Sequence, residues 1–323
     1  MSKITAFGTY APEKILDNKY FESIIDTNHE WIVSRTGIHT RRAVAEDEFT
    51  SDLAVKAVQN LQERSGKTID DVDFIIVSTI TPDQPMPNVA SQVQYKLGIK
   101  NAGCNDLYGA CAGMVYGLQM GNGLIVSGAY KKVLVIGAEA LTRATDYTDR
   151  ATCLLFGDGA GAMLLEPGED DFMAFNSGTS GESGHELYLS HEKDMINGCP
   201  ITANGKILQN GRAVFKWVVK NIPGKIKELA AKANMALDDI DFIIPHSANL
   251  RILEAVGKEL NYPMERIPES ISTNGNTSSA SIPLAMEKAI ADGRIKKGQK
   301  LLLIGFGGGL TYAGAVIRWE LDL

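Results

Sequence analysis

The chain lacks the features of secreted, zinc-stabilised and membrane-spanning proteins. Its 323 residues include only four cysteines, none of them in a C-x-x-C pair: Cys104, Cys111, Cys153 and Cys199. The five histidines do not cluster with these cysteines, so we expect reduced thiols, a cytoplasmic location and no metal site. The N-terminus has no apolar core of signal-peptide length. No run approaches the ~18 apolar residues that cross a bilayer, so no membrane contact is expected.

The sequence also lacks an excess of basic residues and a phosphate-binding loop. Its formal net charge of -7 argues against nucleic acid as a partner, although it leaves room for a local basic patch. Neither G-x-G-x-x-G nor G-K-[ST] is present, which excludes the usual dinucleotide and nucleotide fingerprints. What remains is an ordinary globular composition, 44% hydrophobic and 22% charged, in a chain long enough for about two domains.

The sequence contains an internal repeat. D-D-V-D-F-I-I at 70–76 returns as D-D-I-D-F-I-I at 238–244, which is 168 residues later. K-V-L-V-I-G at 132–137 returns as K-L-L-L-I-G at 300–305, at the same offset of 168. Two apolar segments that share one offset, both preceded by charged residues, indicate two copies of one structural unit.

Each copy alternates continuous apolar runs with amphipathic segments, which is typical of buried strands covered by helices. We therefore predict two α/β halves, 1–168 and 169–323. Strands are predicted at 73–79, 102–107, 132–138, 158–166, 241–245, 300–306 and 312–320. Helices are predicted at 50–66, 88–97, 112–127, 212–232, 250–260 and 278–291. The Gly-, Ser- and Asn-rich segment 178–205 is predicted to be an inserted surface loop, with His185 and His191 in solvent.

Cys111 lies in the stretch Y-G-A-C-A-G, between a predicted strand and a predicted helix. At a helix N-terminus, backbone N–H groups and the helix dipole favour a thiolate, so we expect the pKa of this thiol to be lowered. Its small neighbours would let a substrate carbonyl reach the sulfur. The alternative is a buried cysteine with a packing role only, and the local sequence leaves both interpretations open.

Two polar turns of the second half come next. His246 directly follows the predicted strand 241–245, at the sheet edge where ligands collect in α/β proteins. Asn276 lies in the turn before the helix that is equivalent to the one after Cys111. A structural histidine and a helix-capping asparagine are the alternatives. The repeat brings these turns together, and the glycine run 305–309 offers unobstructed N–H groups for an oxyanion hole.

The motifs as a set resemble the 3-oxoacyl-[acyl-carrier-protein] synthase III family. The resemblance rests on A-C-A-G, P-H-S-A-N-L-R, G-N-T-S-S-A-S and G-F-G-G-G in this order. It also rests on D-T-N-H-E-W-I-V-S-R-T-G-I, T-D-R-A-T-C-L-L-F-G-D-G-A-G-A and N-G-R-A-V-F-K-W, so that it covers nearly the whole chain. It implies a thiolase fold, in which two pseudo-two-fold related α/β halves form five layers, α-β-α-β-α. It also implies a homodimer that initiates type II fatty-acid synthesis.

The resemblance implies roles for individual residues. Cys111 would be the acylated nucleophile of a triad with His246 and Asn276, and the N–H groups of Cys111 and Gly308 would form the oxyanion hole. Phe306 would favour decarboxylation. The implied coenzyme A contacts are Thr27, Trp31, Arg35, Arg150, Gly211 and Asn249, with Trp31 and Arg150 on the adenine. The implied contacts for acyl carrier protein are Lys216 and Arg251, and Met86 would line the partner subunit's primer pocket.

The residue chemistry agrees with the implied reaction, which needs no cofactor. A thiolate attacks acyl-CoA, and malonyl-carrier protein then loses CO2 to give the enolate that attacks the acyl-enzyme. An Asn amide donates hydrogen bonds to an enolate but cannot remove a C–H proton, which favours decarboxylative condensation. Two alternatives remain: a related thiolase-fold acyltransferase of secondary metabolism, and a non-catalytic acyl-binding protein. Because Met86 is flexible, we expect a broader primer range than acetyl-CoA alone.

Overall fold

The first of two main sheets uses strands from the first half of the chain. The computed structural model describes residues 1–169 and 171–323. The strand order is β1-β7-β6-β4-β5, with bounds Ser2–Tyr10, Asp158–Pro167, Val133–Ala140, Phe74–Ser78 and Gly103–Leu107. β4 runs parallel to both β5 and β6, while β7 runs antiparallel to β6 and β1. The parallel core of this sheet is therefore extended by an antiparallel edge.

The second sheet repeats this arrangement with strands from the second half. Its order is β13-β14-β15-β8, with bounds Phe242–Pro245, Lys300–Gly307, Thr311–Arg318 and Phe172–Thr179. β13 and β14 are parallel, and β15 is antiparallel to both of its neighbours. The division of the chain into domains at 168/169 stays a prediction.

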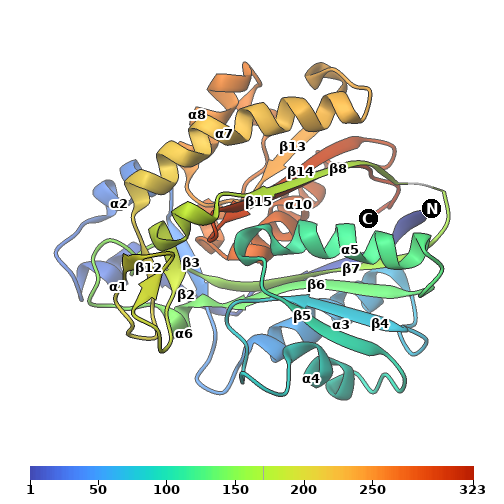
Figure 1. The fold of residues 1–323 in the computed structure, drawn as a ribbon, viewed down its shortest axis with the longest axis horizontal. Helices are drawn as coiled ribbons and strands as arrows, with labels where there is room; N and C mark the ends of the chain where they lie inside the picture. The colour runs from blue at the N-terminus through green and yellow to red at the C-terminus, as the bar shows by residue number, and fades with distance from the viewer. Residues whose placement is uncertain (170) are drawn as a thin grey trace.

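Helices form the other three layers, stacked with the sheets in Figure 1. α3 (Thr50–Ser65) and α4 (Val89–Lys96) cover the outer face of the first sheet. α5 (Gly113–Val126) and α10 (Ser281–Ala291) lie between the two sheets and contact both. α7 (Gly211–Lys232) covers the outer face of the second sheet, with α8 (Leu250–Leu260) packed beside it. The five-layer thiolase fold is thus confirmed.

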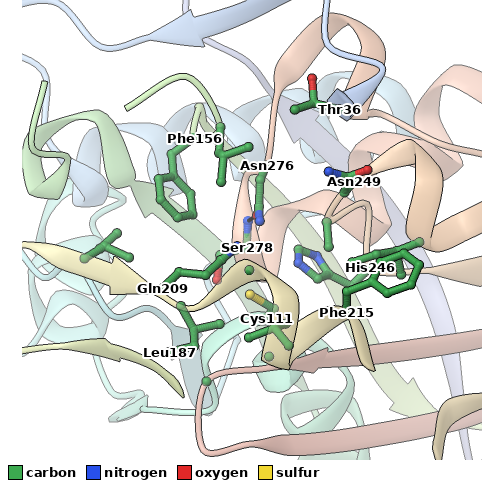
Figure 2. Close-up of a pocket in the computed structure, with 18 of the residues that line it drawn as sticks. Thr36, Cys111, Phe156, Leu187, Gln209, Phe215, His246, Asn249, Asn276 and Ser278 are labelled. Atoms are coloured by element: carbon green, nitrogen blue, oxygen red, sulfur yellow. Dashed lines mark hydrogen bonds between the residues drawn. The ribbon is translucent and has the colours of Figure 1, made fainter. Parts of the chain in front are cut away.

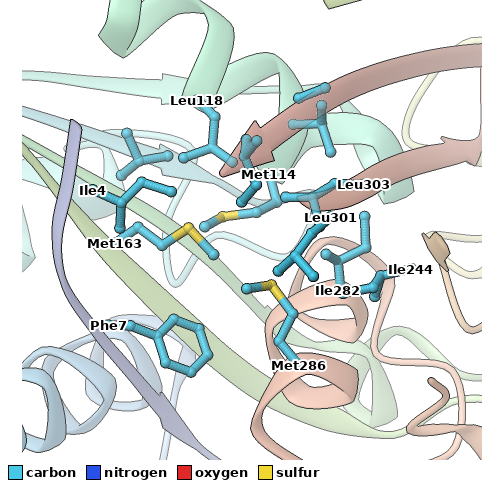
Figure 3. Close-up of a cluster of buried hydrophobic side chains, with 14 of the residues drawn as sticks. Ile4, Phe7, Met114, Leu118, Met163, Ile244, Ile282, Met286, Leu301 and Leu303 are labelled. Atoms are coloured by element: carbon cyan, nitrogen blue, oxygen red, sulfur yellow. The ribbon is translucent and has the colours of Figure 1, made fainter. Parts of the chain in front are cut away.

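The central helix layer is the core of the molecule. Figure 3 shows Met114 and Leu118 of α5 facing Ile282 and Met286 of α10, with strand residues of both sheets around them. Close approach requires glycine in α5, because a Cβ at Gly117 would lie 2.8 Å from Val135 of β6. Burial of apolar surface on both sides of α5 and α10 therefore fixes where their N-terminal turns lie.

Those two turns have the same backbone conformation. Ala110 and Ser278, 168 positions apart, both adopt left-handed φ angles, 45° and 49°. Each begins a short 3₁₀ turn, Ala110–Ala112 before α5 and Ser278–Ala280 before α10. L-residues rarely adopt this region, so its occurrence at both equivalent positions indicates that the turn shape is part of the repeat.

Several elements were not predicted. They are β2 (Lys14–Asp17), α1 (Asn18–Glu22), α2 (His29–Thr36), β3 (Thr40–Ala43), α6 (Leu141–Ala144), α9 (Ile271–Asn274), β1 and β8. Three short 3₁₀ turns, Gly181–Glu186, Leu237–Asp239 and Met264–Arg266, complete the helical elements. Within the described part of the chain, no helix is both long and apolar enough to span a membrane.

The segment 178–205 lies largely at the surface, as predicted for a surface loop, but it also forms short strands that were not predicted. The segment contains β9 (Leu187–Leu189), β10 (Met195–Ile196) and β11 (Cys199–Pro200), and β9 pairs with β12 (Ile207–Gln209). Pairing with β12 places the leucines of β9 against buried clusters, a tertiary effect that the local composition does not reveal. His191 is exposed, as predicted, whereas His185 is only partly exposed: its Nδ1 is buried and its Nε2 lies 3.4 Å from Glu186 Oε1.

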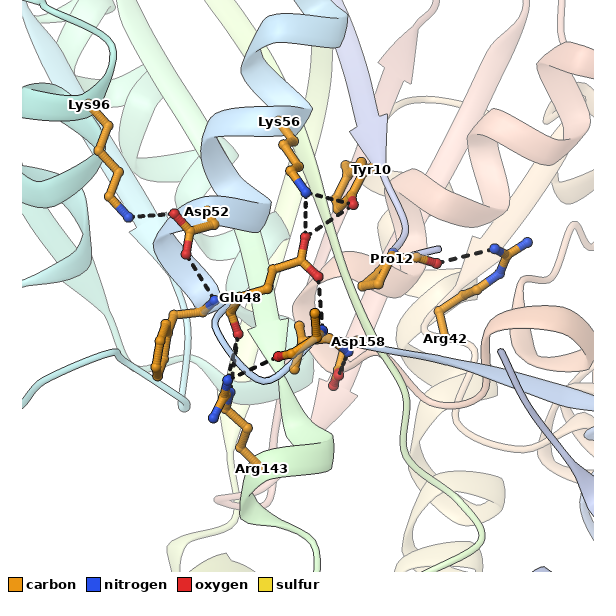
Figure 4. Close-up of polar contacts among 12 residues, drawn as sticks. Tyr10, Pro12, Arg42, Glu48, Asp52, Lys56, Lys96, Arg143 and Asp158 are labelled. Carbon is orange, nitrogen blue, oxygen red and sulfur yellow. Dashed lines mark hydrogen bonds and ion pairs between the residues drawn. The ribbon is translucent and has the colours of Figure 1, made fainter. Parts of the chain in front are cut away.

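A polar cluster holds α6 and the start of β7 in place (Figure 4). Asp158 is buried and accepts hydrogen bonds from Val44 N (2.8 Å), Thr142 N (2.9 Å) and Thr142 Oγ1 (2.5 Å). Nearby, Glu48 pairs with Lys56 at 2.6 Å and accepts from the Tyr10 hydroxyl at 3.1 Å. These contacts join segments that are distant in sequence, and they fix α6 beside the cavity described below.

We expect Asp158→Asn to destabilise the protein by about 1–3 kcal/mol. The amide NH2 would replace one carboxylate oxygen and face a backbone N–H donor, which leaves buried donors without an acceptor. Urea unfolding at pH 7 measures the change. Asp47→Asn, at an exposed position of the neighbouring loop, is the matched control and should stay within about 0.5 kcal/mol. Equal unfolding midpoints for the two variants would contradict the assigned role of Asp158.

Candidate active site

The three turns singled out in the sequence meet in one cavity of about 1560 Å³. Cys111 lies in the 3₁₀ turn before α5, His246 directly follows β13, and Asn276 lies between α9 and α10. Figure 2 shows the three side chains directed toward the same space. They are almost entirely buried, with exposed fractions of 7%, 1% and 6%. A packing role for Cys111 alone does not explain why polar groups from two other elements face the same cavity.

The glycines of β14 allow this strand to pack directly on the Cys111 turn. A Cβ at Gly307 would lie 2.8 Å from Cys111 Sγ, and one at Gly305 would lie 2.6 Å from the Cys111 carbonyl oxygen. Gly308 follows and lines the cavity beside Cys111. The glycine run therefore serves close packing as well as the predicted access to backbone N–H groups.

The prediction of a lowered thiol pKa was wrong. Burial raises the pKa of Cys111 to about 12, and the Glu139 carboxylate adds to this effect. The Ser278 hydroxyl and the backbone N–H of Cys111 lower the pKa of the thiol, but by less. The covering strand, which comes from the other half of the chain, thus outweighs the helix N-terminus. In this closed site the thiol needs a proton acceptor when it reacts.

A hydrogen bond to Ser281 holds the ring of His246. Its Nδ1 lies 2.6 Å from Ser281 Oγ, and that oxygen also accepts a hydrogen bond from Ser247 N at 3.3 Å. When the Ser281 hydroxyl donates to Nδ1, the proton of the neutral ring is on Nε2. Burial lowers the pKa of His246 to about 3, so the ring is uncharged at neutral pH. Phe306 packs edge-on against it, with ring centroids 5.5 Å apart.

Asn276 is oriented as a donor. Its Oδ1 accepts a hydrogen bond from Ser278 N at 2.9 Å, which directs the amide NH2 away from the turn and toward the cavity. Its backbone pairs with the segment of Phe156: Gly157 N donates to the Asn276 carbonyl at 3.0 Å, and Asn276 N donates to the Leu155 carbonyl at 2.9 Å. His246 Nε2–H and the Asn276 amide can therefore both donate to one oxygen of a ligand.

The mouth of the cavity contains most of the predicted coenzyme A residues. Trp31 and Arg150 lie together, with the guanidinium carbon 5.3 Å from the Trp31 ring centroid. Arg35, Gly211 and Asn249 line the same opening. Asn249 caps α8, and its Nδ2 donates to the Arg35 carbonyl at 3.2 Å. A stacked Trp–Arg pair beside further cationic groups suits a planar base and phosphates.

Of four other residues with predicted roles, one lines the cavity and three lie outside it. Arg251 lines the mouth of the cavity, and its Nε donates to the Ser34 carbonyl at 2.6 Å. Lys216 is exposed on α7, outside the cavity. Thr27 lies outside it as well, and among the described residues its buried hydroxyl has no hydrogen-bond partner. Met86 is 86% exposed and lies outside the cavity.

Sequence reasoning missed several residues of the inner cavity. Its apolar wall includes Phe156, Leu187 and Leu189, and Ser278 lies beside Cys111 (Figure 2). Phe156 belongs to one of the quoted motifs but carried no signal of its own. His191 also lines the opening, although it is exposed. No group of three or more potential metal ligands occurs in the described ranges, 1–169 and 171–323.

Comparison with known proteins identifies the family. The chain is 50% identical over 320 residues to beta-ketoacyl-[acyl-carrier-protein] synthase III 2 of Halalkalibacterium halodurans, covering 98% of this chain and 96% of that protein. It is 48% identical to the protein of the same name from Bacillus subtilis, with 98% of both chains covered. The chain belongs to the 3-oxoacyl-[acyl-carrier-protein] synthase III family. Two models of this family match residues 105–181 and 230–319, which contain Cys111 and the His246 and Asn276 turns, respectively.

The synthase III fold is matched as closely as the sequence. The crystal structure of beta-ketoacyl-[acyl carrier protein] synthase III from Thermus thermophilus superposes with a TM-score of 0.94 at 42% identity, covering 98% of this chain and 99% of that one. The structural similarity therefore covers nearly the whole of both chains. The chain is an acyltransferase of the condensing type.

Proposed function

We propose that this protein condenses an acyl-CoA primer with malonyl-acyl carrier protein, and so initiates type II fatty-acid synthesis. The products are 3-oxoacyl-carrier protein, coenzyme A and CO2. The observation that carries the proposal is the presence of Cys111, His246 and Asn276 in one cavity. That cavity is apolar beyond the sulfur and lined by Trp31 and Arg150 at its mouth. No cofactor takes part in this chemistry.

In the first half-reaction, Cys111 Sγ attacks the thioester carbonyl carbon of acyl-CoA. The backbone N–H groups of Cys111 and Gly308 stabilise the tetrahedral oxyanion, and coenzyme A leaves as its thiol, with the proton that Cys111 gives up, as the acyl-enzyme forms. Because the walls around the sulfur are apolar, including Phe156 and Leu187, the acyl chain is shielded from water.

In the second half-reaction, malonyl-carrier protein loses CO2 and its enolate attacks the acyl carbon on Cys111. The new C–C bond forms as the C–S bond breaks, and the Cys111 thiolate leaves. His246 Nε2–H and the Asn276 amide donate hydrogen bonds to the thioester oxygen as negative charge develops there. Decarboxylation supplies the carbanion, so neither side chain has to remove a proton from carbon. Phe306, beside His246, provides an apolar surface that favours loss of the carboxylate.

The carrier protein would approach over α7 and α8. Lys216 is exposed on α7, and Arg251 lies at the cavity mouth on α8. Cationic side chains here would attract an acidic partner to the opening, even though the protein as a whole carries a net charge of -7. We therefore expect KM for the carrier protein to depend on the salt concentration.

We further propose a cytoplasmic homodimer. Met86, Tyr95 and Tyr108 are 86%, 83% and 66% exposed, which is unusual for large apolar side chains on a free surface. Packing against a second copy would cover them and bring Met86 to the partner's primer pocket. Light scattering that returned the mass of a single chain would contradict the dimer.

We expect Trp31→Ala to raise KM for acyl-CoA about 10-fold with little change in kcat, since a cation–π stack contributes roughly 1–2 kcal/mol to binding. Initial rates over a range of acetyl-CoA concentrations measure this. Trp31→Phe, which keeps an aromatic face, should restore part of the affinity. An acetyl thioester of N-acetylcysteamine has no adenine, so its turnover should be the same in all three proteins. An equal loss with the short thioester would contradict adenine stacking.

We expect the purified protein to form 3-oxoacyl-carrier protein from malonyl-carrier protein with more than one primer. Acetyl-, isobutyryl- and isovaleryl-CoA are to be compared by mass spectrometry of the carrier protein. The apolar inner wall and the flexible Met86 favour acceptance of branched chains. A strict preference for acetyl-CoA would contradict the predicted broad range of primers. Turnover of acyl-CoA without any 3-oxoacyl product would instead point to a different acceptor, as in an acyltransferase of secondary metabolism.

A further inference from the structure

A buried arginine lies beside the segment that pairs with Asn276. Arg41, in β3, is fully buried. Its Nε donates to the Leu154 carbonyl at 2.7 Å, and its Nη2 donates to the same oxygen. Its Nη1 donates to Asn18 Oδ1 at 2.5 Å, and the guanidinium carbon lies 4.4 Å from the centroid of the Phe21 ring. Contacts from several segments therefore fix the position of this guanidinium.

The acceptors of Arg41 are neutral. In the described part of the chain the guanidinium donates to oxygens of a carbonyl and an amide, and not to a carboxylate. Burying a charge without an opposite charge costs free energy, and burial lowers the pKa of Arg41 to about 9. An apolar side chain of similar volume often serves stability as well as a buried ionic group does. The guanidinium therefore points to a role in holding particular backbone atoms.

The carbonyl that Arg41 binds adjoins the backbone that holds Asn276. Leu154 is followed by Leu155, whose carbonyl accepts a hydrogen bond from Asn276 N at 2.9 Å. A parallel β-bridge joins Phe156 to Asn276, and Figure 2 shows these two side chains next to each other. By holding the Leu154 carbonyl, Arg41 fixes the segment to which the Asn276 backbone is bonded.

The aliphatic stem of Arg41 contacts the other side of this pairing. A Cβ at Gly275 would lie 2.7 Å from Arg41 Cγ and 3.0 Å from the Leu155 carbonyl oxygen. Gly275 also has a φ of 69°, a left-handed conformation that favours glycine. One side chain thus packs against the residue before Asn276 and binds the residue before Leu155.

We propose that Arg41 is a positioning residue for Asn276, which rests on the proposed role of the Asn276 amide in decarboxylation. The hydrogen bond from Ser278 N orients the amide only relative to its own turn. Arg41 fixes that turn relative to residues 154–156, which line the cavity. Arg41 thereby sets where the amide NH2 meets the enolate oxygen. A misplacement of ~1 Å at a reacting group can slow a reaction by about 10²-fold.

Arg41→Met keeps the apolar stem and removes the group that donates. We expect kcat for malonyl decarboxylation, measured as CO2 release without primer, to fall by roughly 10–10²-fold at unchanged KM for malonyl-carrier protein. Acylation of Cys111 by acetyl-CoA should stay within about threefold of the parent, because the nucleophile and the glycines of β14 belong to other elements. Arg41→Lys keeps the charge and can donate to the Leu154 carbonyl, so it should recover part of the decarboxylation rate.

Arg42→Met is the matched control. Arg42 is the next residue of β3, and its Nη1 donates to the Pro12 carbonyl at 3.2 Å. This variant should leave both half-reactions within about twofold of the parent. The decisive measurement combines Arg41→Met with Asn276→Asp. If Arg41 acts through the Asn276 amide, the double variant should decarboxylate no more slowly than Asn276→Asp alone, because the donor is already absent.

Decarboxylation by Arg41→Met at the parent rate would overturn the positioning role and leave the proposed function intact. The same holds if the two losses multiply in the double variant, or if both half-reactions fall equally with a lowered Tm, since Arg41 would then only stabilise the fold. A parent protein that releases no CO2 from malonyl-carrier protein would overturn the proposed function as well. If Arg41→Met does not fold, Arg41→Lys enters the same comparison, and a rate equal to the parent's there would overturn the inference.

Discussion

Cys111→Ala should take no acyl group from acyl-CoA and should form 3-oxoacyl product at least about 10⁴-fold more slowly than the parent protein. The reason is that no other described residue of the cavity is a cysteine, so the covalent intermediate cannot form. Intact mass spectrometry reports the adduct, and product formation reports the condensation. Because only one sulfur is removed from a small buried site, the fold should persist.

The same variant should still decarboxylate malonyl-carrier protein, since His246 and Asn276 are unchanged and supply the hydrogen bonds for that step. Cys153→Ala is the matched control. Cys153 is equally buried but lies outside the cavity, so this variant should acylate and condense at rates close to those of the parent. Condensation by Cys111→Ala at more than a few per cent of the parent rate would refute the assigned nucleophile.

Asn276→Asp should reduce malonyl decarboxylation by roughly 10²–10³-fold, the cost of losing one donor to a developing oxyanion. The change keeps Oδ1, which accepts from Ser278 N, and therefore keeps the turn. It replaces the donating NH2 with a second acceptor oxygen, which repels the enolate. Release of CO2 from malonyl-carrier protein is the measurement, and acylation of Cys111 should be affected far less.

Asn274→Asp is the control for charge in the same loop. Asn274 lies two residues earlier, accepts from Thr273 Oγ1 at 2.7 Å and does not line the cavity. It should leave both half-reactions nearly unchanged. If Asn276→Asp slowed acylation and decarboxylation equally, Asn276 would be a scaffold for the turn and would not be the donor proposed here.

The strands and the meeting of the triad could be predicted because they follow from local patterns. Strands such as β14 are buried on both faces and therefore appear as continuous apolar runs. The repeat then makes the turns before α5 and α10 equivalent, so the turns of Cys111 and Asn276 meet, and the His246 turn after β13 joins them. Predicting this required no knowledge of side-chain contacts.

The N-terminal elements could not be predicted, because contacts with distant residues hold them. Asn18, in the short helix α1, donates to the Ile38 carbonyl at 2.9 Å and accepts from the guanidinium of Arg41, which also donates to the Leu154 carbonyl. Five-residue helices and four-residue strands have little stability of their own. Their polar sequences accordingly gave no clear period.

The thiol pKa illustrates the same limit. The sequence around Cys111 contains the helix N-terminus that favours a thiolate, but the strand that buries the sulfur lies in the other half of the chain. The local motif therefore left the role of Cys111 open and predicted the wrong direction for its acidity. The family resemblance did not indicate the direction of the pKa shift either. The pKa of Cys111 is raised because Gly305 and Gly307 approach the turn so closely that they bury the sulfur.

That close approach has a consequence during biosynthesis. The ribosome adds Gly307 196 residues after Cys111, so the sulfur leaves the exit tunnel long before the strand that covers it exists. Until β14 is added to the sheet, the nascent chain presents a thiol at a helix start with neither its apolar cover nor its raised pKa. In the finished protein the second half of the chain covers this sulfur and so limits its oxidation.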